Sequence, residues 1–184
     1  MESHENQTLS DATGFAVAKL VEDYTETWNT LLRYDEDRLE IPTTGRPSTT
    51  VLELDLAVEA INTFKRFLDI RGEATSLFGN QPDDGLAAIL GNVEQTMFDE
   101  PVYQSPQEKA ANLLYFVIKS HPFTDGNKRI GALLFLLYLT REDISNDLTP
   151  HTLTALTLLI AESEPAKKDL MIRLIVNLIT SSLT

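Results

Sequence analysis

The segment from Ile130 to Leu139 is the longest near-continuous apolar run in the chain. It has about half of the roughly 20 residues that a membrane-spanning helix needs, so it is typical of a helix buried in a globular domain. Its apolar side chains would cover most of a helix surface, with Leu133, Leu134, Leu137 and Tyr138 on one face and Phe135, Leu136 and Leu139 on the others. We therefore expect a central helix over residues 128–141, buried on most sides.

The remaining segments show mainly the three- and four-residue spacing of amphipathic helices. We expect these helices over residues 11–33, 53–70, 86–95, 106–120, 151–162 and 166–181. Asp11 is a good N-cap for the first helix, in which Tyr24 and Trp28 should belong to the core. Pro106 suits a first helical turn, and Glu108 lies favourably near the positive end of that helix.

Three segments lack helical spacing. Residues 41–50 (IPTTGRPSTT) are rich in Pro, Ser and Thr and predict a linker or surface loop, and residues 79–85 (GNQPDDG) predict a turn. Residues 96–105 (TMFDEPVYQS) predict an extended or hairpin element. With strands otherwise nearly absent, the sequence predicts an all-α fold with an arm at 1–10, a helix and linker at 11–52, and a core domain at 53–184.

Charge and composition exclude several function classes. The chain has 28 acidic and 15 basic side chains, and its net charge of −13 disfavours nucleic-acid or anionic-membrane binding, which needs basic patches. The absence of Cys excludes disulfide scaffolds, thiolate zinc sites and cysteine nucleophiles. The N-terminus is polar and lacks the apolar core of a targeting signal. We expect a cytoplasmic protein that binds neither membranes nor nucleic acid.

The polar segment HPFTDGNKR, residues 121–129, separates two apolar helices. Helical spacing predicts that His121 points inward at the end of the first helix. Free N–H groups at the start of the next helix form an anion site, and Lys128 and Arg129 add positive charge there. Asp125 places beside them a carboxylate that could bind Mg²⁺ together with substrate phosphates.

Taken singly, each of these residues has an ordinary explanation as a helix cap, a turn or a solvated cation. Together at one helix start, they favour a phosphate–metal pocket with a neutral-pH base, His121, above it.

The segment HPFTDGNKR resembles the signature of the Fic/Doc (filamentation / death-on-curing) superfamily, His-x-Phe-x-Asp/Glu-Gly/Ala-Asn-Gly/Lys-Arg. Residues 108–116 (EKAANLLYF) resemble the family's helix before the motif. Residues 156–164 and 169–178 resemble RhuM-like proteins, whose C-terminal region is a Fic/Doc domain. The resemblance implies an all-α fold with a β-hairpin flap before the motif helix, which corresponds to residues 96–105.

The resemblance also implies roles for the motif residues. His121 would be the general base that takes the proton from a Ser, Thr or Tyr hydroxyl of a target protein. Asp125 would bind Mg²⁺, and the nucleotide phosphates, from ATP or another nucleotide, would be bound by Gly126, Asn127, Lys128 and Arg129. Phe123 would be a packing residue. The flap would hold a target segment as an added strand, through Thr96, Met97, Phe98, Val102 and Tyr103.

Two positions depart from the pattern of nucleotide-transferring members, which have Gly where this chain has Lys128 and a second Arg where it has Ala132. The departure resembles death-on-curing toxins, which phosphorylate a target protein with ATP. Protein phosphorylation is therefore narrowly favoured over AMPylation or other NMP transfer.

The regulatory helix of some family members, Ser/Thr-x-x-x-Glu-Gly/Asn, has no match, because Leu54 follows Thr49-x-x-x-Glu53. Restraint of a toxic activity would then come from a separate antitoxin or regulatory partner. An alternative of another class is a non-catalytic interaction module with the same fold.

Overall fold

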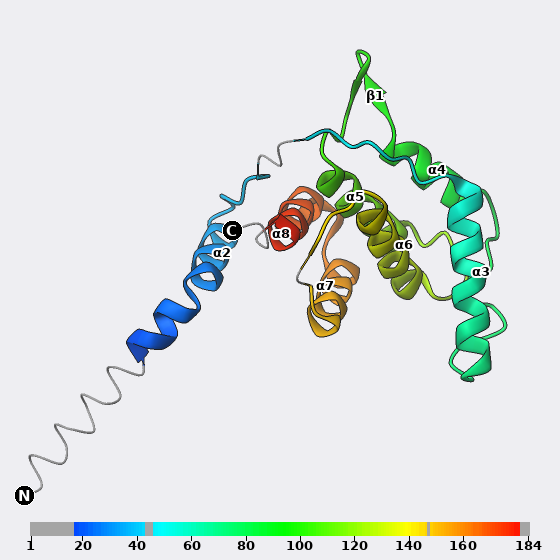
Figure 1. The fold of residues 1–184 in the computed structure, drawn as a ribbon, viewed down its shortest axis with the longest axis horizontal. Coiled ribbons are helices and arrows are strands. Elements are labelled where there is room, and N and C mark those ends of the chain that lie inside the picture. Colours follow the sequence, from blue (N-terminus) through cyan, green and yellow to red (C-terminus); the bar gives the residue numbers. More distant parts are fainter. Residues whose placement is uncertain (1–16, 43–45, 147, 181–184) are drawn as a thin grey trace, which may run out of the picture. The chain divides into compact units, whose positions relative to one another are not determined.

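The computed structural model describes residues 17–42, 46–146 and 148–180. The chain divides into two compact units, with the boundary between Leu39 and Glu40 (Figure 1). The predicted core boundary at residue 53 falls within the second unit. The predicted arm at 1–10, and the predicted helix start at residues 11–16, lie outside the described residues.

The described part of the first unit is helical at residues 17–23 and again in α2, Thr25–Asp35, with a turn at Tyr24 between them. At this turn, Thr25 Oγ1 donates to the carbonyls of Val21 and Glu22. The expectation that Tyr24 and Trp28 belong to a core is wrong, since they are 53% and 48% exposed. No residue of α2 is buried, and within residues 17–39 the structure describes no element outside these two helical stretches.

The second unit is a helical bundle with one short hairpin, which confirms the predicted all-α class. Its elements are α3 (Leu54–Ile70), α4 (Gly85–Val93), β1 (Thr96–Met97), β2 (Glu100–Pro101), α5 (Pro106–Ser120), α6 (Asn127–Arg141), α7 (Pro150–Glu162), a 3₁₀ turn η1 (Pro165–Lys167) and α8 (Lys168–Thr180). These bounds agree with the predicted ranges to within a few residues at each end.

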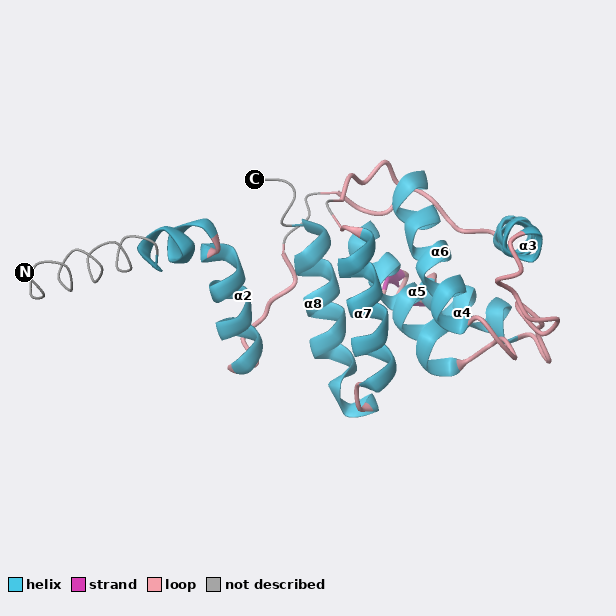
Figure 2. Ribbon diagram, turned by 90° about the horizontal axis from the view of Figure 1, so that it is seen from below, coloured by secondary structure: helices cyan, strands magenta, loops and turns pink. Residues whose placement is uncertain are grey.

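Helix α5 lies at the centre of this unit and packs against α4, α6, α7 and α8 (Figure 1). It begins where the sequence predicts, with a capping box between Ser105 and Glu108 and with Pro106 in the first turn. Helix α6 was expected to be central and buried on most sides. It does bury Leu134, Phe135 and Tyr138, but Leu136 is 38% exposed and α5 occupies the centre. Helix α3 stands at one side of the bundle, against α4 and α6 (Figure 2).

The buried carboxylate of Glu142, just after α6, fastens residues 48–50 to the bundle. It accepts hydrogen bonds from Ser48 Oγ at 2.7 Å and from the backbone N–H groups of Thr49 and Thr50 at 3.0 and 2.8 Å. Arg46 pairs with it at 2.9 Å. Burial alone would raise the pKa of Glu142, but the hydrogen bonds from Ser48, Thr50, Arg46 and Thr49 outweigh burial and lower it.

The predicted hairpin is present, with β1 and β2 paired antiparallel and Thr96 opposite Pro101. At its tip, Phe98 and Asp99 adopt positive φ angles of 53° and 67°, as a tight turn requires. Phe98 is 94% exposed. Within the described residues, no helix is long and apolar enough to cross a membrane.

Candidate active site

Helix α5 ends at Ser120 because His121 adopts a left-handed conformation, with φ 50° and ψ 56°. This conformation turns the side chain out of the helical path, so His121 is exposed and the predicted inward orientation is wrong. The ring is held by a hydrogen bond of 3.2 Å between Nδ1 and the carbonyl of Lys119. A carbonyl accepts only, so Nδ1 carries the proton and Nε2 keeps a free lone pair.

Asn127 closes the loop between His121 and α6. Its Oδ1 accepts from the backbone N–H of Phe123 at 3.0 Å, and its Nδ2 donates to the carbonyl of Phe123 at 2.7 Å. The ring of Phe123 is buried, at 2% exposure, which anchors the loop as predicted for a packing residue. Both polar atoms of the Asn127 side chain therefore hold the loop. A phosphate at this helix end would contact backbone N–H groups and the cations Lys128 and Arg129 instead.

Gly126 is the N-cap of α6 and has a φ of 91°, which side chains other than hydrogen rarely allow. A Cβ on Gly126 would lie 2.4 Å from Cε2 of Phe78. Because Gly126 has no side chain, the N-cap residue provides no capping hydrogen-bond acceptor to the first turn of α6. The backbone N–H groups of this turn are left to bind an anion.

A pocket of about 320 Å³ lies at this helix end. It is lined by His121, Thr124, Asp125, Gly126, Asn127, Lys128 and Arg129. The structure thus brings together the predicted base, the predicted metal ligand and both cations. The pocket lies within the range typical of small-molecule sites.

Arg129 is held in place from three sides. One Nη donates to the carbonyl of Glu73 at 2.9 Å, and the other lies 3.8 Å from Oδ2 of Asp125. The guanidinium also lies 4.5 Å from the ring centroid of Phe78, as in a cation–π contact. These contacts leave it 41% exposed, so it can still reach a ligand in the pocket.

Asp125 is fixed by a hydrogen bond of 2.6 Å from Thr75 Oγ1 to its Oδ2. This bond is the main cause of a lowered pKa for Asp125, and Gly126 and Arg129 also lower it, so the carboxyl is ionised at neutral pH. Among the described residues, no group of three or more His, Asp or Glu could hold a metal ion. One ionised carboxylate beside a phosphate site fits Mg²⁺ bound jointly by protein and phosphate.

Residues 73–80 do not line this pocket but form a supporting wall behind it, which sequence reasoning missed. Gly79 N–H donates to the carbonyl of Asp125 at 3.1 Å, and Thr124 N–H donates to the carbonyl of Asn80 at 2.9 Å. Phe78 and Asp125 form an isolated parallel bridge. The available sequence signal was weak: an apolar Phe78 directly before the predicted turn that begins at Gly79.

A model of the Fic/DOC family matches residues 48–139, which is half of the chain. The chain belongs to the Fic/DOC family. The match includes the whole pocket beside His121, the wall formed by residues 73–80, and the hairpin. No curated protein and no solved structure is similar enough to this chain to count as a match.

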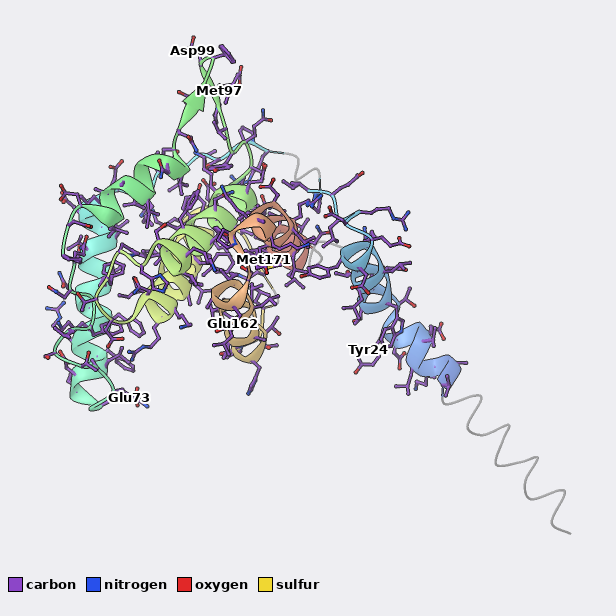
Figure 3. The ribbon with its side chains drawn as sticks, turned by 180° about the vertical axis from the view of Figure 1, so that it is seen from behind. Tyr24, Glu73, Met97, Asp99, Glu162 and Met171 are labelled. Atoms are coloured by element: carbon purple, nitrogen blue, oxygen red, sulfur yellow. The ribbon has the colours of Figure 1, made fainter. Side chains whose placement is uncertain are left out.

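In this Fic/DOC chain, the hairpin does not lie beside the motif. It leads into the start of α5, whereas His121 ends that helix, and 15 helical residues span roughly 22 Å. Figure 3 shows Met97 and Asp99 of the hairpin at the opposite end of the unit from Glu73, whose carbonyl binds Arg129. The predicted flap residues are Thr96, Met97, Phe98, Val102 and Tyr103, and none of them lines the pocket with His121.

Proposed function

We propose that this Fic-type transferase moves a phosphate-containing group from a nucleotide, ATP, to a Ser, Thr or Tyr hydroxyl of a target protein. The observation that carries the proposal is the position of His121 beside an open helix N-terminus with two cations. The proposal rests also on membership of the Fic/DOC family.

His121 serves as the general base. Its Nδ1 proton is committed to the carbonyl of Lys119, so Nε2 accepts the proton of the target hydroxyl. As the hydroxyl oxygen forms its bond to phosphorus, the bond to the leaving group breaks. The leaving group is ADP when the γ-phosphoryl group is transferred and pyrophosphate when AMP is transferred.

The start of α6 holds the phosphates. Backbone N–H groups of the first turn supply directed donors, and Arg129 offers the planar fork that suits phosphate oxygens. Lys128 is exposed in the same pocket and adds a point charge. Mg²⁺ would be held by Asp125 and would neutralise charge on the phosphates.

Protein phosphorylation is narrowly favoured over AMPylation. Lys128 and Ala132 are four residues apart and therefore share one face of α6. This face carries a Lys where nucleotide-transferring members have Gly, and it lacks their second Arg. Kinship with RhuM-like proteins stays a prediction from residues 156–164 and 169–178. Restraint by a separate antitoxin or regulatory partner stays a prediction from the unmatched regulatory motif.

The test compares α-labelled and γ-labelled ATP in a host lysate with Mg²⁺. Label on a protein from γ-labelled ATP alone supports phosphorylation, and label from α-labelled ATP supports AMPylation. His121→Ala should abolish either transfer, whereas His151→Ala, an exposed His at the start of α7, should not. Transfer that survives His121→Ala would refute the base assignment, and no transfer from any nucleotide would favour a non-catalytic module.

A further inference from the structure

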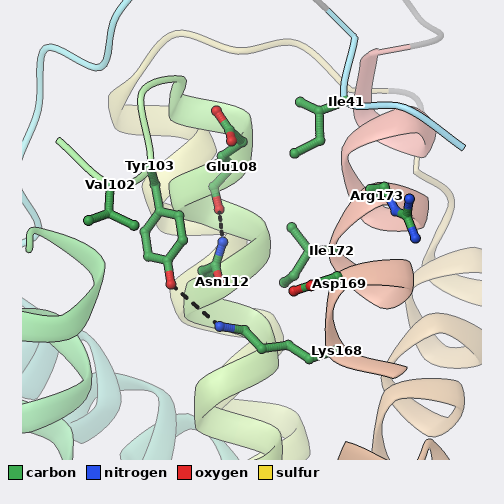
Figure 4. A pocket seen from close by; sticks show the side chains of 9 residues that line it. All are labelled: Ile41, Val102, Tyr103, Glu108, Asn112, Lys168, Asp169, Ile172 and Arg173. Carbon is green, nitrogen blue, oxygen red and sulfur yellow. Dashed lines mark hydrogen bonds between the residues drawn. The ribbon is translucent and has the colours of Figure 1, made fainter. Parts of the chain in front are cut away.

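A second pocket lies near the other end of α5, between the residues that follow the hairpin and α8 (Figure 4). Its volume is about 400 Å³, against about 320 Å³ for the pocket beside His121. The two pockets share no lining residue, and the second lies within the size range of small-molecule sites. The proposed transfer reaction uses none of its residues.

One part of this pocket is apolar. Ile41, Val102 and Ile172 line it together with the ring of Tyr103. Ile172 is 6% exposed, whereas Ile41 and Val102 are 39% and 36% exposed. An aliphatic or aromatic group placed here would cover these side chains and gain hydrophobic stabilisation.

The polar part of the pocket carries charges of both signs. The ammonium of Lys168 lies 3.4 Å from the hydroxyl of Tyr103 and 4.5 Å from the ring centroid of Phe116, and neither of these neighbours is charged. Asp169, next to Lys168, places a carboxylate in the same wall. An anionic group can pair with Lys168, and a cationic group can pair with Asp169. A single ligand that carries both charges can form the two ion pairs at once.

Asn112 supplies a polar atom without a partner. Its side chain lies between Tyr103 and Ile172 (Figure 4), and the residue is 1% exposed. Its Nδ2 donates to the carbonyl of Glu108 at 2.9 Å, but its Oδ1 has no hydrogen-bond partner within the described part of the chain. A buried acceptor without a donor costs free energy, and a ligand would reach Oδ1 only after a small movement of the pocket exposed this atom.

We propose that this pocket binds a zwitterionic α-amino acid with an apolar side chain. The carboxylate of the ligand pairs with Lys168, and its ammonium pairs with Asp169. The apolar side chain packs against the apolar part of the wall. Glu108 and Arg173 add one charge of each sign, so the wall is neutral overall and matches a ligand without net charge. A polyphosphate would meet two carboxylates here, which disfavours a second nucleotide.

Calorimetric titration of the full chain with L-leucine and L-methionine tests the proposal. Saturable binding of at least one of them is expected. N-acetyl-L-leucine lacks the ammonium and L-leucine amide lacks the carboxylate, so each should bind at least about tenfold more weakly than L-leucine. No binding of either amino acid at about 10 mM, or equal binding of the blocked compounds, would overturn the proposal.

Two variants locate the binding. Lys168→Met and Asp169→Asn should each weaken L-leucine binding by about tenfold or more, since each removes one charge pair. Lys167→Met is the matched control, because Lys167 is exposed and does not line the pocket. Circular dichroism verifies that each variant is folded. If Lys168→Met is unfolded, the affinity of Asp169→Asn for L-leucine decides whether the pocket is the binding site. Unchanged affinity in a folded variant of either kind would overturn the proposal. Label transfer is not part of these readouts, so they stand or fail independently of the proposed reaction.

Discussion

Gly126 lies so close to Phe78 that no side chain fits between them, since a Cβ would stand 2.4 Å from the ring. The same contact places the ring 4.5 Å from the guanidinium of Arg129. The contact between Gly126 and Phe78 therefore bears on both the uncapped start of α6 and the position of Arg129. From the sequence, Gly126 was expected among the residues that bind phosphate, whereas its packing against Phe78 was not predicted.

Gly126→Ala should destabilise the protein by about 2–4 kcal/mol, because it combines a clash with a left-handed backbone angle. Urea denaturation measures the loss. Gly91→Ala is the control, since Gly91 lies within α4 and a Cβ there has nothing within 4 Å. That substitution should stabilise by roughly 0.5–1 kcal/mol. Equal effects at the two positions would contradict the packing described at Phe78.

Helical spacing gave the wrong orientation for the side chain of His121. Counting from Ile118 places its side chain inward only if the helix continues, but the helix ends one residue earlier and His121 turns outward. Helix ends depend on a single pair of backbone angles, which the spacing of apolar residues does not report. The sequence therefore predicted that His121 lies at the end of this helix, but it did not predict the direction of the side chain.

At the scale of elements, the bounds of α5 followed from local chemistry, since Ser105, Pro106 and Glu108 specify a helix start without help from the rest of the chain. The wall of residues 73–80 could not be predicted from local chemistry, because its hydrogen bonds join residues that are far apart in the sequence. Thr75 and Asp125 are 50 positions apart, and Glu142 and Thr50 are 92 apart. No periodicity connects such pairs, so the candidate site was predicted without one of its walls.

Phe78→Leu should lower stability by about 1–3 kcal/mol and weaken Mg-ATP binding, because the ring packs on Gly126 and Phe64 and supports Arg129. Phe67→Leu is a matched control: Phe67 also lies beneath an arginine, Arg71, but is 55% exposed. It should change stability by less than about 0.5 kcal/mol and leave nucleotide affinity unaltered. A larger effect at Phe67 on either measurement would refute this account of the wall.

The contact between residues 48–50 and Glu142 predicts a pH dependence. The lowered pKa of Glu142 means that its contribution to stability is fully present above the ordinary glutamate value of 4.5 and is lost as pH falls through the lower folded value. Glu142→Gln should cost about 2–4 kcal/mol at neutral pH and should flatten the loss of stability below pH 4.5. The measurement is the free energy of unfolding from pH 7 to 3.

Glu59→Gln, at an exposed position of α3, is the control for this pH series. It should follow the unaltered chain at every pH, because Glu59 lacks the buried hydrogen bonds of Glu142. A Glu142→Gln variant with an undiminished loss of stability in acid would show that other carboxylates carry the dependence.

At the scale of the whole molecule, the two units differ in how well apolar spacing predicted burial. In the second unit, spacing predicted helices that the structure buries. In the first unit, the same spacing predicted a core around Tyr24 and Trp28, although both are exposed. An amphipathic pattern predicts a helix, whereas burial also needs a second surface, which sequence spacing does not reveal.

A chain that begins at Arg38 should keep the fold of the second unit, since α2 buries no residue. Its unfolding midpoint in urea should agree with that of the full chain, and label transfer from ATP to the target protein should persist. Urea denaturation followed by circular dichroism measures the midpoint, and the labelled-ATP assay measures the transfer. A large drop in the midpoint would show that the second unit depends on residues before Arg38.

We propose that His121 is a base beside a phosphate site and that it contributes little to nucleotide binding. The most direct measurement takes Mg-ATP affinity and label transfer together in His121→Ala. Label transfer should fall by at least about 100-fold, because the proton acceptor is gone, while the dissociation constant of Mg-ATP should change by less than about threefold. Transfer at the unaltered rate, or a loss of nucleotide binding equal to the loss of transfer, would contradict this proposal.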